Sequence, residues 1–207
     1  MRKLLVLSVI VCTVAHVQAQ ELRTIELNVP SRERGLSVIA ALSQRQSIRE
    51  YADRQLELQD LSDLLWAAVG INRPESGKRT APTALNRQEI DVYVCMEEGA
   101  YLYDAKSHAL KPVAKGDYRG VVAAGQDWVK TAPVVLVIVA DVSKYNGEIL
   151  MPAADAGIVS QNISLFCAGT GLATVPRATM DQAQLRKVLK LKEGQRPILN
   201  HPVGYAK

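Results

Sequence analysis

A valine-rich run from Pro133 to Val139 constrains the fold most, because its residues are apolar on both faces of an extended chain. A strand of this kind is typical of the centre of a sheet, where both faces are covered by other elements. We therefore expect this run to be a central strand.

Four helices are predicted from apolar residues at helical spacing. They cover residues 35–43, 61–69, 153–170 and 180–191, and the third is expected to be long and largely buried. Gly70 stands at the end of the second helix, and Gly169 or Gly171 at the end of the third, where glycine often ends a helix. Asn162 on the third helix is read as a core amide bonded to backbone, with a ligand-facing role as the alternative.

The middle of the chain predicts a hairpin. Residues 90–94 alternate like a strand, residues 97–99 turn the chain, and residues 100–103 return it. The segment 72–88 before this hairpin is rich in Pro, Gly and polar residues, so we expect a loop there. The helices do not alternate with strands, and no Gly-rich turn joins a strand to a helix. This organisation predicts an α+β fold and excludes a doubly wound dinucleotide-binding fold.

The N-terminus predicts export. Arg2 and Lys3 precede an uncharged apolar run, and small residues follow at the cleavage positions, so residues 1–19 are interpreted as a signal peptide and 20–207 as one mature domain. A lipoprotein anchor at Cys12 is disfavoured, and no stable membrane anchor is expected. A protein exported in this way would be periplasmic or secreted.

Composition excludes several other functions. Removing the signal peptide leaves 23 Lys plus Arg against 21 acids, scattered rather than gathered in a stripe, which argues against nucleic-acid binding. Cys95 and Cys167 both lie in apolar runs and are expected to be free, buried thiols. No spacing suggests a metal site. His108 and His201 are interpreted as structural or surface residues.

The pentapeptide Arg45-Gln46-Ser47-Ile48-Arg49 places two guanidiniums and a hydroxyl directly after a helix. Such groups can bind a phosphate, because a guanidinium donates two parallel hydrogen bonds to its oxygens. A solvated, charged loop is the alternative that these five residues leave open.

Four segments, in order, resemble the nitroreductase family. They are Arg45 to Tyr51, the stretch Leu58 to Asn72 with its Leu-Leu-Trp-Ala-Ala core, Gly77 to Ala84, and a closing pattern that runs from Gly171 to Tyr205. The resemblance covers nearly the whole mature chain. It implies a helix-flanked, mainly antiparallel sheet and a homodimer that holds FMN at its interface, with a reduced nicotinamide and a small molecule as reaction partners.

The resemblance also implies which residues bind FMN. Arg45, Gln46, Ser47 and Arg49 would hold the phosphate and ribityl chain. Residues of the partner chain would reach the flavin ring, namely Pro82, Thr83, Ala84 and Asn86. The loop beside the ring would be formed by Pro176, Arg177, Ala178 and Thr179, whose backbone N–H groups face the reactive edge. Gln126 is a further candidate for the ring edge. No residue is expected to be a nucleophile or a general base, since the flavin carries the chemistry.

Three features depart from the family pattern. Gln46 replaces the usual Arg or His, and Ala178-Thr179 stands where Glu-Gly or Gly-rich pairs are common. The chain ends at Lys207, so we expect Lys207 to take over part of the work of a longer basic tail. Two alternatives follow from these observations and from the motifs: an azoline-dehydrogenase-like flavoenzyme, and a non-catalytic binding protein that has lost FMN.

Overall fold

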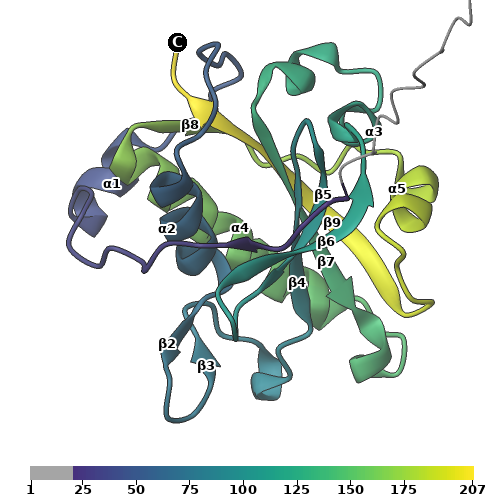
Figure 1. The fold of residues 1–207 in the computed structure, drawn as a ribbon. Coiled ribbons are helices and arrows are strands. Elements are labelled where there is room, and N and C mark those ends of the chain that lie inside the picture. The colour runs from purple at the N-terminus through teal and green to yellow at the C-terminus, as the bar shows by residue number, and fades with distance from the viewer. Residues whose placement is uncertain (1–20) are drawn as a thin grey trace, which may run out of the picture.

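The computed structural model describes residues 21–207, so the expected signal peptide lies outside the described residues. Its main sheet has seven strands in the order β1-β6-β5-β4-β7-β9-β8, and every neighbouring pair is antiparallel (Figure 1). The strands are β1 (Ile25–Glu26), β4 (Ile90–Cys95), β5 (Gly99–Asp104), β6 (Ala109–Lys115), β7 (Val134–Asp141), β8 (Leu172–Thr174) and β9 (Gln195–Tyr205). A separate small sheet pairs β2 (Ile71–Arg73) with β3 (Lys78–Arg79).

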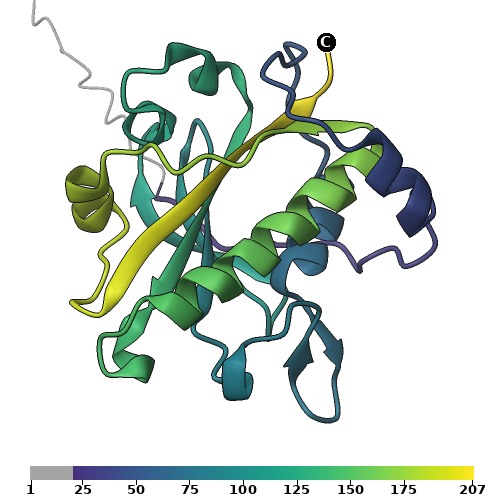
Figure 2. The ribbon, with the colours of Figure 1, turned by 180° about the vertical axis from the view of Figure 1, so that it is seen from behind.

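Helices cover both faces of the main sheet. They are α1 (Val38–Gln44), α2 (Leu58–Val69), α3 (Arg119–Ala123), α4 (Leu150–Thr170) and α5 (Gln182–Val188), with short 3-10 turns η1 (Ala84–Asn86), η2 (Asp127–Thr131) and η3 (Val142–Tyr145). The 21-residue α4 crosses the molecule from end to end, with α1 beside its C-terminal end (Figure 2). The α+β prediction and the helix-flanked antiparallel sheet are therefore confirmed.

Strand β7 is the common wall of two hydrophobic cores. Val134, Leu136 and Ile138 face the core shared with α2 and α4. Val135, Val137 and Val139 face the core shared with α3 and α5. Successive strand residues point to opposite faces, so an unbroken apolar run is what a strand covered on both sides requires. The predicted central strand is confirmed, as is the 90–103 hairpin, which forms β4 and β5.

Helix α4 matches its prediction and begins three residues earlier than expected. Val159, Ile163 and Cys167 form its buried stripe, whereas Ile158 on its other side is 37% exposed. Gly171 ends the helix in the left-handed conformation, with φ of 77°, which is accessible to glycine without strain. Asn162 donates a 3.1 Å hydrogen bond to the Ala67 carbonyl on α2, as expected of a core amide.

Three segments differ from their predictions. The expected loop 72–88 contains the β2–β3 hairpin and the turn η1. The expected short end is the eleven-residue strand β9, although it includes two prolines. Pro202 fits because its main chain faces away from β7, toward the Thr174 hydroxyl, and Pro197 fits because it lies at a register shift against β7. The predicted 180–191 helix is shorter, and forms only α5.

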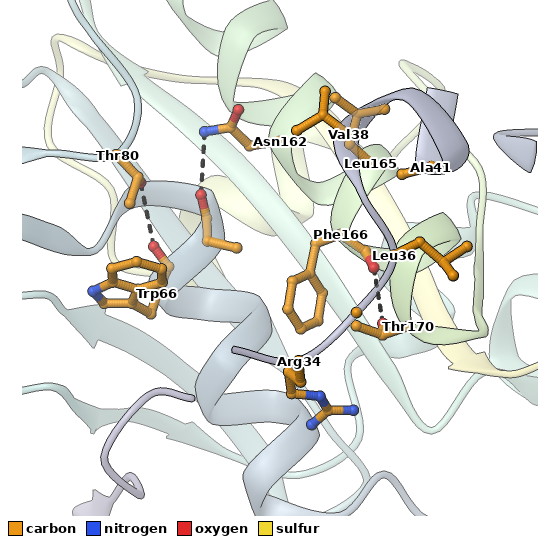
Figure 3. Close-up of a pocket in the computed structure, with 13 residues that line it drawn as sticks. Arg34, Leu36, Val38, Ala41, Trp66, Thr80, Asn162, Leu165, Phe166 and Thr170 are labelled. Carbon is orange, nitrogen blue, oxygen red and sulfur yellow. Dashed lines mark hydrogen bonds between the residues drawn. The ribbon is translucent and has the colours of Figure 1, made fainter. Parts of the chain in front are cut away.

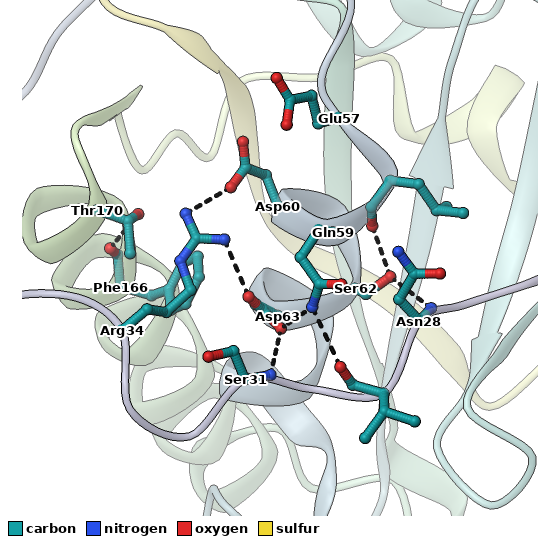
Figure 4. A network of polar contacts seen from close by, with 12 residues as sticks. Asn28, Ser31, Arg34, Glu57, Gln59, Asp60, Ser62, Asp63, Phe166 and Thr170 are labelled. Atoms are coloured by element: carbon teal, nitrogen blue, oxygen red, sulfur yellow. Dashed lines mark hydrogen bonds and ion pairs between the residues drawn. The ribbon is translucent and has the colours of Figure 1, made fainter.

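Arg34 ties the segment before α1 to helix α2 (Figure 4). Its guanidinium pairs with Asp60 at 2.6 Å and with Asp63 at 3.0 Å. Asp63 also accepts a 2.8 Å hydrogen bond from the Ser31 backbone, and the Tyr205 hydroxyl at the end of β9 donates to Asp60. One cation therefore compensates two largely buried carboxylates, and these carboxylates link the N-terminal segment, α2 and β9.

The described cysteines and helices bear on two further expectations. Cys95 and Cys167 are buried and free, which confirms that they serve as small core residues. Across residues 21–207, no helix is both long enough and apolar enough to span a bilayer.

His201 on β9 connects α4 and β8 through hydrogen bonds inside the core. Its side chain is fully buried, with Nε2 at 2.7 Å from the Ser160 hydroxyl of α4 and Nδ1 at 3.2 Å from the Thr174 hydroxyl of β8. Burial lowers the pKa of His201 to about 3, because a charged imidazolium there would lose its hydration. The structural reading of this histidine is confirmed.

This buried histidine predicts acid sensitivity. The neutral imidazole stabilises the fold above the unfolded-state pKa of His, about 6.5, and that stability is lost as the pH falls from there toward the folded pKa, by up to about 1.4 kcal/mol per unit. In His201→Gln this part of the slope should vanish, whereas His108→Gln should keep it and lose only the smaller part that comes from the lowered pKa of the half-buried His108. Urea unfolding at a series of pH values measures the slope. An unchanged slope in His201→Gln would rule out His201 as its source.

Candidate functional site

The basic segment 45–49 follows α1 and is exposed except at Ile48, which fixes it to the rest of the chain. The Ile48 backbone donates a 2.9 Å hydrogen bond to the Thr174 carbonyl at the end of β8. The buried Tyr51 donates its hydroxyl to the Ile48 carbonyl at 3.2 Å, and its own backbone bridges to Ala206. Ile48 is half-buried, while the side chains on either side of it are exposed: Arg45, Gln46, Ser47 and Arg49.

Arg45 and Arg49 carry charges that no carboxylate of the described residues neutralises. Within residues 21–207, ion pairs are made by Arg34, Arg119 and Lys130. Arg45, together with Gly171 and Ala206, lines an open depression, and the exposed Lys207 follows Ala206 in the chain. The Arg49 guanidinium lies 6.0 Å from the centre of the Trp128 ring. This end of the molecule therefore presents positive charge that is free to meet an anion.

Arg177 lies on the other flank of this region and points inward. Its guanidinium is 5.4 Å from the centre of the Trp128 ring and donates to Asn200 Oδ1 at 2.6 Å, to the Ala123 carbonyl at 3.2 Å, and to Gln126 Oε1 at 3.2 Å. All these acceptors are neutral. Burial lowers the pKa of Arg177, and that lowering is the mark of a cation held in the interior without a carboxylate.

This arrangement changes what Arg177 and Gln126 can offer a ligand. The Arg177 backbone N–H is already bonded to the Asn200 carbonyl at 2.9 Å, so it is engaged within the chain rather than free to face a flavin. The amide oxygen of Gln126 accepts hydrogen bonds from the Arg177 side chain. The neighbouring loop residues Pro176, Ala178 and Thr179 are exposed. Of these three, Ala178 and Thr179 carry backbone N–H groups, since proline has none.

The segment from Pro82 to Asn86 lies at the opposite end of α4. The Ala84 backbone N–H donates to Asp155 Oδ2 at 2.9 Å, and Asp155 stands near the start of that helix. Pro82 and Asn86 are exposed, and Thr83 is half-buried. The basic segment, in contrast, borders Ala168 near the end of α4. At 1.5 Å per residue, Asp155 and Ala168 are separated by about 20 Å along the helix axis.

The structure thus divides the predicted site residues into two groups. One group gathers around Trp128 and the C-terminal end of α4: Arg45, Gln46, Ser47, Arg49, Gln126, Pro176, Arg177, Ala178, Thr179 and Lys207. The other group, Pro82, Thr83, Ala84 and Asn86, lies around η1. Within one chain the two groups are not brought together.

An apolar pocket between α1, α2 and α4 was not predicted from the sequence (Figure 3). Trp66 and Phe166 face it, and the side chain of Asn162 crosses its edge to reach the Ala67 carbonyl. Trp66 donates its ring N–H to the Ile71 carbonyl at 3.1 Å, and this bond fixes the ring. The sequence places Trp66 next to the buried stripe of α2, but only the packing of α1 on α4 makes a pocket there.

Comparison with known proteins assigns the chain to a family. The Nitroreductase family model matches residues 42–205, so the chain belongs to the nitroreductase family. It is therefore an oxidoreductase of this family, and the resemblance seen in the sequence motifs is confirmed.

Individual relatives agree with that assignment. A nitroreductase-family protein of Methanocaldococcus jannaschii is 31% identical over 195 residues, which are 87% of this chain and 96% of the relative. The Bacillus subtilis protein named FMN reductase (NAD(P)H) is 24% identical over 187 residues, 81% of this chain and 65% of that relative. A crystal structure of a Ralstonia eutropha nitroreductase-family protein superposes with a TM-score of 0.82 at 38% identity and 90% coverage of both chains.

The buried Arg177 predicts a large stability effect. Arg177→Met should destabilise the fold by about 2–4 kcal/mol, because it leaves buried carbonyl oxygens and the Asn200 amide oxygen without donors. Arg177→Lys should recover only part, since an ammonium cannot reproduce the guanidinium fork. The matched control is Arg45→Met, an exposed arginine of the same region, which should change stability by less than about 0.5 kcal/mol. Urea denaturation tests this, and equal effects at positions 45 and 177 would refute the interior role.

Proposed function

We propose that this chain is an FMN enzyme which, as a homodimer, transfers hydride from a reduced nicotinamide or another donor to an electron-poor small molecule such as a nitroaromatic or a quinone. The observation that carries the proposal is the exposed, unpaired state of Arg45 and Arg49 beside the Ser47 hydroxyl. A phosphate dianion meets there two charged forks and a neutral donor on a segment that is fixed at Ile48.

The residues around Trp128 fit the rest of such a cofactor. With the phosphate at Arg45, the ring would lie by the exposed loop residues Ala178 and Thr179, whose backbone N–H groups can donate to its polar edge. The buried Arg177 fixes the base of that loop through Asn200. When bound, FMN supplies the hydride transfer, and the chain's residues supply binding, orientation and the local field.

The geometry of α4 supports a site shared by two chains. If the phosphate and the ring both lie at the C-terminal end of α4, the η1 segment of the same chain is about 20 Å away along the helix and cannot reach them. A second chain running in the opposite direction would bring its own Asn86 to that ring.

The exposed apolar surface supports such an association. Val38 and Ile39 on α1 are 67% and 76% exposed, and Leu85 and Leu150, near the start of α4, are 82% and 75% exposed. Large apolar side chains gathered along one helix and its two ends are typical of an association surface.

The phosphate contact predicts a selective loss of affinity. Arg45→Ala or Arg49→Ala should weaken FMN binding at least tenfold, because each charge-assisted contact contributes about 1.5–3 kcal/mol. Riboflavin, which lacks the phosphate, should bind nearly as before, and lysine at either position should restore FMN binding only in part. Flavin fluorescence titration measures both ligands, with the exposed Arg23→Ala as control.

Two results would contradict this assignment. Equal weakening of both flavins would mean that the arginines support the loop rather than the phosphate. A wild-type protein that stays colourless and takes up no added FMN would favour the non-catalytic binding protein instead.

The shared site predicts complementation between variants. Arg45→Ala and Asn86→Ala homodimers should each carry two defective sites. A heterodimer of the two variants, purified through two different tags, should have one intact site, because Arg45 of one chain and Asn86 of the other would then meet unaltered. Half of its sites should bind FMN with wild-type affinity.

Light scattering should give a dimer for the wild-type protein and for this mixed species. A heterodimer with no intact site, or a monomer that holds FMN fully, would refute the two-chain site.

A further inference from the structure

Glu89 and Asp155 are neighbouring buried acids, and Asp155 contacts the η1 segment. Glu89 is 1% exposed and Asp155 is 4% exposed. Neither carboxyl oxygen of Glu89 accepts a hydrogen bond from another described residue, and the neighbouring Tyr145 hydroxyl donates to the Ala84 carbonyl instead. An ionised carboxylate in such a place has lost its hydration without a compensating partner, which disfavours the charged form.

Asp155 is the member of the pair that holds the η1 segment. Its Oδ2 accepts the Ala84 backbone N–H at 2.9 Å, and the Ala84 carbonyl accepts the Tyr145 hydroxyl at 2.9 Å. The next two residues, Leu85 and Asn86, have φ values of 56° and 53°, in the left-handed region that residues other than glycine rarely adopt. A strained turn of this kind persists only where its surroundings hold it. The two hydrogen bonds to Ala84 help to hold this turn in place.

The surrounding charges leave the pair uncompensated. The ammonium group of Lys144 on η3 donates hydrogen bonds to the backbone carbonyls of Arg87 and Gln88, at 3.0 and 3.2 Å. Arg87 stacks on the ring of Tyr145, with its guanidinium carbon 4.3 Å from the ring centre. Burial and the neighbouring Asp155 raise the pKa of Glu89 to about 7, while Glu89's own backbone N–H and, to a smaller extent, Lys144 oppose the rise.

The hydrogen bonds indicate which acid carries the proton. Asp155 already accepts from the Ala84 backbone N–H, whereas no other described residue donates to Glu89. A proton on Glu89 makes that residue a donor and leaves Asp155 an acceptor for both neighbours.

We propose that Glu89 and Asp155 share one proton, and that this proton makes them positioning residues which hold the Pro82–Asn86 segment in the shape that meets the cofactor of the partner chain. The first half concerns this chain alone. The second half rests on the proposed function.

The sign of the pH dependence follows from the raised pKa of Glu89. The folded state keeps the proton up to about pH 7, whereas the unfolded chain releases it near the ordinary value of Glu, about 4.3. The stabilisation is therefore complete below the unfolded value and is lost as the pH rises through the folded value. Above that pH two buried negative charges repel, and the hold on Ala84 weakens.

Hydrogen exchange of the Ala84 amide tests the first half without any flavin. In the wild-type protein its protection factor should fall by roughly tenfold or more between pH 6 and pH 8.5, as the proton is lost. In Glu89→Gln, whose neutral amide still donates to Asp155, protection should stay within about twofold over the same range. Glu75→Gln, an exposed glutamate in the β2–β3 turn, is the matched control and should behave as wild type.

Two exchange results would overturn proton sharing. One is a wild-type protection factor that stays constant with pH, which needs no variant to observe. The other is an equal fall in wild type and Glu89→Gln.

Flavin binding tests the second half. Riboflavin is the informative ligand, because the phosphate of FMN has a pKa near 6 and changes charge itself over this range. Riboflavin affinity should fall with rising pH in parallel with Ala84 protection in the wild type, and should be nearly independent of pH in Glu89→Gln. A riboflavin affinity that does not change with pH while the Ala84 protection factor falls would overturn the positioning role. Failure of the wild type to bind any flavin at any pH would overturn the proposed function and the positioning role with it, while the exchange data would still decide proton sharing.

Discussion

Burial of β7 on both faces is the constraint on which the rest of the structure depends. Its alternate side chains divide the interior into one core under α2 and α4 and another under α3 and α5. A strand with two apolar faces is stable only when helices cover both, so the positions of the flanking helices follow from it. The basic segment, the Arg177 loop and the η1 segment all lie on elements that this strand supports.

Helix α4 converts that architecture into a functional geometry. It is long, and it carries different chemistry at its two ends: the unpaired Arg45 near Ala168, and a strained turn held by Asp155 near its start. A single chain keeps the two ends apart. Any site that needs both must therefore be built by two chains, which is why association and cofactor binding are linked in the proposal.

Charge is treated differently at each of these places. Arg34 is paired with two carboxylates, Arg177 is buried among neutral acceptors, and Arg45 is exposed with no acidic partner. Only the last arrangement leaves a charge available to a ligand. Glu89 shows the opposite case, a buried acid to which no other described residue donates, where a proton rather than a cation provides the compensation.

The sequence by itself determined the elements whose signals are local: the two-faced run of β7, the buried stripe and glycine end of α4, the β4–β5 hairpin, and the chemistry of the segment around Arg45. Tertiary structure alone decided what depends on contacts between distant residues. Strand β9 was missed because its prolines are tolerated only through the neighbours they have in the sheet. The inward turn of Arg177 and the pairing of Glu89 with Asp155 join residues more than twenty positions apart, and no periodicity encodes such contacts, because side-chain direction at a buried site is set by what packs against it.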